Sequence, residues 1–136
     1  MIILLRVLFL IVLGSMLWVT TWASLHCPLF AVPHDVFAHP WFIATMFDAY
    51  WGFITFFVWV CYKENSGLAR VAWFVAIMLL GNIAMASYWL AELFRAPADG
   101  QLADVLVRRR DGAGRLGPAL AVLGVAVVAL AWPRSG

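Results

Sequence analysis

Residues 71–91 read VAWFVAIMLLGNIAMASYWLA and contain no charged side chain. As a continuous helix these 21 residues would be about 31 Å long, close to the roughly 30 Å hydrocarbon core of a bilayer. The run is too apolar all round for a helix that keeps one face in water. It therefore predicts an integral membrane protein.

The composition also indicates that the chain lies in lipid. Hydrophobic residues make up 65% of the chain and charged residues only 12%, whereas soluble proteins average about 25% charged. Nothing in the sequence could form a second, water-soluble domain. The basic residues form no stripe with interleaved aromatics, so we expect no binding to nucleic acid.

Four apolar blocks predict an all-α fold, a small transmembrane helical bundle with four spanning helices, or three if the last block does not cross. The blocks cover residues 7–25, 40–62, 71–91 and 116–133. The first block also suits a signal peptide cut before Ser24. Its apolar stretch exceeds the usual core of about 7–15 residues, however, so we expect an uncleaved helix.

These blocks divide the chain into three parts. We expect a three-helix transmembrane core at residues 1–95, a polar, arginine-rich connector at 96–115, and a fourth transmembrane helix with a short tail at 116–136. In the connector, Arg108, Arg109 and Arg110 follow one another. They could hold anionic lipid headgroups or serve only as a topological anchor, and both interpretations stay open.

The tryptophans mark expected membrane boundaries. Trp41 and Trp59 bracket the second block, and Trp73 and Trp89 bracket the third. Their separations correspond to about 27 and 24 Å along a helix, close to the distance between the two interfaces where indole rings are favoured. This spacing predicts that Trp73 and Trp89 lie at opposite faces of the membrane.

Four spans give no clear orientation. With a cytoplasmic amino terminus, one side holds four basic residues (Arg6, Lys63, Arg70 and Arg134) and the other five (Arg95, Arg108, Arg109, Arg110 and Arg115). The positive-inside rule needs an excess on one side. Only Arg6, which precedes the first block, favours a cytoplasmic amino terminus.

Asp48 is the one acidic residue inside an apolar block. A central aspartate costs about 2.5–3.5 kcal/mol in lipid, so it should face protein or water. Steps of three and four residues place it on one helical stripe with Thr45 and Thr55. An antiparallel third helix would bring Asn82, Tyr88 or both to Asp48. This seam is either a hydrogen-bonded staple or a proton or ligand site.

The remaining charged residues near the helix ends look superficial. Glu92 and Arg95 are three apart and predict a surface ion pair of little energetic value. Lys63, Glu64 and Arg70 lie in a tight loop and have the same interpretation. Glu64 could also bind a substrate headgroup, but nothing in its sequence surroundings requires that.

The loop at residues 25–39 carries all three histidines. His26, His34 and His39 are weak candidates for zinc or copper ligands, together with Cys27 and Asp35. Their spacing matches no established zinc pattern, and the loop's prolines disfavour a preformed cage. We therefore predict neither a metal site nor another cofactor.

Part of the chain resembles a known family. The segments MFDAYWGF with Asp48, FFVWVCYKE ending at Glu64, and RVAWFVAIMLLGNIAMASYWLAELF resemble small uncharacterised membrane proteins of a domain-of-unknown-function family found in bacteria and plants. The resemblance covers about residues 37–94. It implies a multi-pass membrane protein and no assigned activity.

No nucleophile motif, phosphate loop or catalytic carboxylate pair occurs in the sequence. We therefore expect a non-enzymatic accessory, assembly or structural protein of a bacterial cytoplasmic membrane. It would act in the lipid bilayer through helix–helix contacts, as a homo-oligomer or in a larger complex. The alternative is a membrane-embedded enzyme or carrier for an apolar small molecule, such as an isoprenoid or pigment, that uses Asp48.

Overall fold

The computed structural model describes residues 1–133 except residue 113, and every named element within them is helical. Arg134, one of the basic residues weighed for orientation, lies outside the described residues. The elements in chain order are α1 (Ile2–His26), η1 (Leu29–Ala31), α2 (His34–Ala38), α3 (Pro40–Lys63), α4 (Gly67–Leu80), α5 (Asn82–Arg95), α6 (Leu102–Val107) and α7 (Leu116–Ala131). The predicted all-α class is confirmed.

Two of these helices, α1 and α3, are long and apolar enough to cross a membrane. Helix α1 contains the first predicted apolar block, and α3 contains the second. Pro40 opens α3, where its missing N–H costs nothing, and the ring of His39 accepts a hydrogen bond from the backbone of Trp41. Helices α4 and α7 are apolar but shorter.

The uncharged run at residues 71–91 does not form one helix. Helix α4 ends at Leu80, and α5 begins at Asn82. Between them Gly81 adopts φ +53° and ψ −125°, a backbone conformation that residues with a Cβ atom rarely adopt. A Cβ at this position would also lie 2.7 Å from the ring of Phe53. The prediction of a continuous third helix is therefore wrong.

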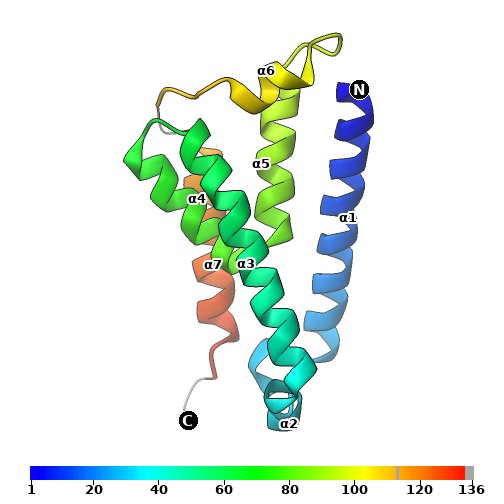
Figure 1. The fold of residues 1–136 in the computed structure, drawn as a ribbon. Helices are drawn as coiled ribbons and strands as arrows, with labels where there is room; N and C mark the ends of the chain where they lie inside the picture. Colours follow the sequence, from blue (N-terminus) through cyan, green and yellow to red (C-terminus); the bar gives the residue numbers. More distant parts are fainter. Residues whose placement is uncertain (113, 134–136) are drawn as a thin grey trace.

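The chain reverses at Gly81, so α4 and α5 form the two arms of a V (Figure 1). Lys63, just before α4, forms an ion pair with Glu92 near the end of α5. Both arms therefore open toward the same end of the bundle. Trp73 packs against Tyr88, the neighbour of Trp89, with ring centroids 4.8 Å apart. The prediction that Trp73 and Trp89 lie at opposite faces is also wrong.

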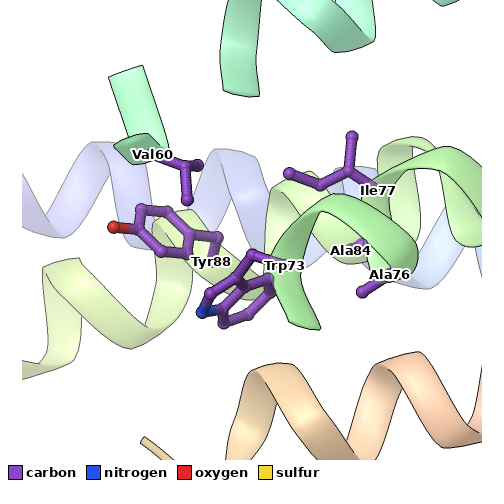
Figure 2. Close-up of a cluster of buried hydrophobic side chains, with 6 residues drawn as sticks. All are labelled: Val60, Trp73, Ala76, Ile77, Ala84 and Tyr88. Atoms are coloured by element: carbon purple, nitrogen blue, oxygen red, sulfur yellow. The ribbon is translucent and has the colours of Figure 1, made fainter. Parts of the chain in front are cut away.

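The arms of the V carry most of the core. Figure 2 shows its central cluster, in which the rings of Trp73 and Tyr88 lie beside the smaller side chains. The cluster consists of Val60, Trp73, Ala76, Ile77, Ala84 and Tyr88. By contrast, residues 14–26, 40–52 and 125–131, all described by the structure, include no buried residue. We call these three segments the open half of the bundle.

Helices α1 and α7 flank the V on two sides. Helix α1 packs on α5, where the Arg6 guanidinium donates hydrogen bonds to the carbonyls of Leu93 (2.8 Å) and Ala96 (2.7 Å). Those carbonyls end α5 and have no partner within the helix, so Arg6 caps it. Helix α7 packs closely on α4 through Gly117, next to Trp73, and Gly124, next to Leu79.

The bundle has two chemically different ends. The described basic residues all lie at or beside the end where α3 stops, α5 stops and α6 lies; they are Arg6, Lys63, Arg70, Arg95, Arg108, Arg109, Arg110 and Arg115. We call this the basic end. The opposite end holds η1, α2 and the last turn of α7, where Trp132 meets Phe30 at 5.3 Å between ring centroids.

Candidate functional site: a buried charge cluster and an arginine cleft

A group of charged side chains is buried at the basic end. Lys63 ends α3 and Glu64 caps it, so both are held where the chain turns into α4. The connector runs alongside them, with the backbone N–H of Arg110 donating to the Lys63 carbonyl at 2.7 Å. Helix α5 supplies Tyr88 and Glu92. We call Lys63, Glu64, Tyr88, Glu92 and Arg110 the charge cluster.

The cluster is closely paired. Lys63 Nζ lies 2.6 Å from Glu92 Oε2, and Arg110 Nη1 lies 3.1 Å from Glu64 Oε1 and 3.3 Å from Glu92 Oε1. The Tyr88 hydroxyl donates to Glu64 Oε1 at 3.1 Å. Two carboxylates thus face two cations, which compensates the charge. The cluster thereby ties the ends of α3 and α5 to the connector.

Because these ion pairs are buried, the loss of one partner is costly for stability. The side chains of Lys63, Glu64 and Glu92 are at most 6% exposed. Removing one partner of a buried ion pair leaves an uncompensated charge, which costs about 3–5 kcal/mol. The predicted Glu92–Arg95 ion pair is confirmed, with 2.9 Å between Arg95 Nη1 and Glu92 Oε1. Only Arg95 is at the surface, whereas Glu92 is buried in the charge cluster. Lys63 and Glu64 are likewise buried rather than at the surface.

A cleft of about 1010 Å³ lies next to the cluster. It is bounded by the end of α5, by α6 and by the connector that follows α6. Its basic lining residues are Arg95, Arg108, Arg109 and Arg110. Arg109 is partly held, because its Nε donates to the Tyr62 carbonyl at 3.0 Å and its guanidinium lies 5.5 Å from the Tyr62 ring centroid. We call this feature the arginine cleft.

The predicted seam does not come together. Asp48, Thr45 and Thr55 are exposed on α3, and Asn82 is exposed at the start of α5. Thr45 and Thr55 donate to backbone carbonyls of their own helix. Tyr88 is buried, but its hydroxyl meets Glu64, not Asp48. The antiparallel register failed because the chain turns back at Gly81 before reaching the depth of Asp48.

The three histidines lie at the end opposite the charge cluster. His26, His34 and His39 are all exposed, and no group of three metal-binding side chains occurs among the described residues. His26 Nδ1 lies 2.8 Å from the Trp22 carbonyl, and the His39 ring accepts a hydrogen bond at the start of α3. Local backbone contacts therefore account for two of the three imidazoles.

The charge cluster escaped the sequence-based interpretation for a specific reason. Its acids and bases stand at the edges of apolar blocks, where a spanning topology would separate Lys63 from Glu92 by a membrane thickness. The one signal that could have revealed it is Gly81, followed by Asn82, in the middle of the apolar run. A glycine and an asparagine are typical of a turn.

No curated protein and no solved structure matches the chain. A family model, described as a protein of unknown function (DUF1475), matches residues 1–126. The match extends well beyond the predicted range of 37–94 and includes α1, the connector and most of α7. The resemblance to a family of unknown function is confirmed: the chain belongs to the family DUF1475.

Proposed function

We propose that this chain is a multi-pass protein of a bacterial cytoplasmic membrane, an accessory or assembly element that acts through helix–helix contacts. In this proposal α1, α3 and α7 cross the bilayer, whereas α4 and α5 enter and leave it on one side. The gathering of basic residues at one end supports this topology, because the positive-inside rule then assigns that end to the cytoplasm. The amino terminus is cytoplasmic as well.

The open half carries the proposal of an assembly role. The bundle has a packed core around the V, but its three crossing helices continue beyond Gly81 with no buried residue among residues 14–26, 40–52 and 125–131. Helices in lipid gain stability by packing against one another. A second copy of the chain would supply the missing neighbours for the open half.

Asp48 identifies the face of α3 that a second copy would cover. It is exposed in the open half, about 22 Å from the basic end of α3, in a segment we place within the bilayer. Leaving a carboxyl against lipid is costly, and a helix–helix contact removes that cost. Gly52 lies one turn away with no atom of the described residues within 4 Å of its Cβ position, so another helix can approach closely.

Cysteine cross-linking in native membranes tests the proposed face. In a background with Cys27→Ser and Cys61→Ser, Thr55→Cys lies on the stripe of Asp48, whereas the matched control Ile54→Cys lies at the same depth about 100° away around the helix. We expect a disulfide-linked dimer for Thr55→Cys and not for Ile54→Cys. Equal cross-linking at both positions, or none at either, would contradict self-association through this face.

Particle size provides a second test. Gly52→Leu places a bulky side chain in the proposed contact, and Gly67→Leu adds the same side chain in open space at the start of α4, outside the open half. In mild detergent, light scattering should show a smaller particle for Gly52→Leu only. A wild-type chain that purifies with an unrelated protein in fixed ratio would replace self-association by a larger complex. A wild-type monomer without partners would refute the assembly role.

A second candidate function rests on a different feature. A hollow of about 320 Å³ on α3 is lined by Met46, Phe47, Tyr50, Trp51 and Ile54. Such an apolar recess supports a carrier or enzyme for an apolar small molecule of isoprenoid or pigment type. Asp48 is not among the lining residues, so the hollow suits binding better than acid–base chemistry. Mass spectrometry of an organic extract of the purified protein tests it, and an extract containing only bulk phospholipid would exclude it.

A further inference from the structure

The arginine cleft has a composition that the assembly role does not require. We infer that it binds a phosphate group, and specifically the phosphate of an anionic lipid headgroup at the basic end of the bundle. Guanidinium groups form planar, paired hydrogen bonds with phosphate oxygens, and several of them around one hollow form a typical site for this ligand.

The charges of the cleft favour an anion. Its four arginines face three carboxylates, those of Glu92, Asp104 and Asp111. Two further partners lie outside the cleft and offset each other in this count: Lys63 pairs with Glu92 at 2.6 Å, and Glu64 pairs with Arg110 at 3.1 Å. Asp111 accepts a hydrogen bond from the side-chain amide of Asn65. The surplus in the cleft is therefore positive.

The arginines divide into structural and available groups. Arg110 is held by Glu64 and Glu92, and Arg95 by Glu92. Arg108 and Arg109 are exposed, and the contact of Arg109 with the Tyr62 carbonyl uses only its Nε. The terminal nitrogens of these two side chains supply the donors for a phosphate. Arg110 and Arg95 line the same cleft but are already paired with carboxylates.

The surroundings favour a lipid over a soluble phosphate compound. Val107, which lines the cleft, is 58% exposed. This apolar side chain beside Arg108 suits the start of an acyl chain. If the basic end faces the cytoplasm, as the proposed topology has it, the cleft lies at the depth of lipid headgroups. The phosphate site itself does not depend on the assembly role.

Native mass spectrometry of the full chain released from nanodiscs tests the inference. The probes are phosphatidylglycerol and phosphatidylcholine in equal amounts, and the variants are Arg108→Gln and Arg109→Gln. Arg115→Gln is the matched control, because Arg115 is exposed at the basic end but does not line the cleft. A basic residue near a charged surface contributes about 1 kcal/mol, so each cleft variant should bind phosphatidylglycerol about fivefold more weakly.

The outcomes separate the two sources of phosphate. Preferential binding of phosphatidylglycerol that falls in both cleft variants and persists in Arg115→Gln supports the lipid site. Calorimetry with inorganic phosphate, on protein in phosphatidylcholine nanodiscs, tests binding of a soluble phosphate. Saturable binding there, lost in Arg108→Gln, without any preference for phosphatidylglycerol would replace the lipid by a soluble ligand. Equal behaviour of all variants toward both probes would overturn the phosphate site, provided that their melting temperatures match the wild type.

Discussion

The indole of Trp73 and the phenol of Tyr88 meet edge to face with ring centroids 4.8 Å apart, although 15 positions separate them in the sequence. In a continuous helix the two residues would lie about 22 Å apart along the axis. The contact exists because the chain reverses at Gly81. The same reversal brings Glu92 to Lys63 and thereby creates the charge cluster.

Substitution of Gly81 by alanine should destabilise the fold. The positive φ disfavours any side chain, and the new Cβ would meet the Phe53 ring at 2.7 Å. We expect a loss of about 1–3 kcal/mol in the free energy of unfolding, measured by denaturant titration in mild detergent. Gly14→Ala is the control, because its Cβ would meet no described atom within 4 Å. An unchanged stability of Gly81→Ala would argue against the turn.

Thiol labelling distinguishes the reversal from a third crossing. In the background without Cys27 and Cys61, we expect Asn65→Cys and Asp99→Cys to react with a membrane-impermeant reagent from the same side. Both positions flank the V at the basic end of the bundle. Asp35→Cys should react only from the other side. A continuous helix at residues 71–91 would place positions 65 and 99 on opposite sides. Labelling of right-side-out and inverted vesicles provides the measurement.

Removal of Glu92 should unbalance the charge cluster. Glu92→Ala leaves Lys63, which is fully buried, without its carboxylate, and we expect a loss of about 3–5 kcal/mol in the free energy of unfolding. The double variant Lys63→Met with Glu92→Leu removes both charges and should recover part of that loss. Asp35→Ala, an exposed acid at the other end, should change little. A double variant less stable than Glu92→Ala would contradict this explanation.

The close packing of α7 on α4 depends on Gly124. A Cβ there would lie 3.0 Å from Leu79 Cβ, so Gly124→Leu forces the helices apart. We expect a cost of about 1–3 kcal/mol and faster proteolysis of the connector, followed by gel electrophoresis of time points. Val125→Leu adds bulk at the neighbouring exposed position and should have no such effect. Equal proteolysis of both variants would show that α7 does not rely on this contact.

Several features of the fold could be predicted from the amino-acid sequence. Apolar blocks and their lengths located α1, α3 and α7 and indicated the all-helical class. The family resemblance, carried by the segments around Asp48 and Glu64, was also correct. The Glu92–Arg95 pair followed from a three-residue helical spacing. Each of these depends on residues close together in the sequence.

The direction of the chain after Leu80 was decided only by the tertiary structure. Hydropathy cannot distinguish one helix that crosses a bilayer from two shorter helices that return to the same side. The same apolar residues make up both arrangements. The outcome depended on one glycine backbone conformation and on its contact with Phe53 from another helix. The sequence alone therefore determined where the apolar helical segments lie, whereas the position of Gly81 against α3 decided which charges meet.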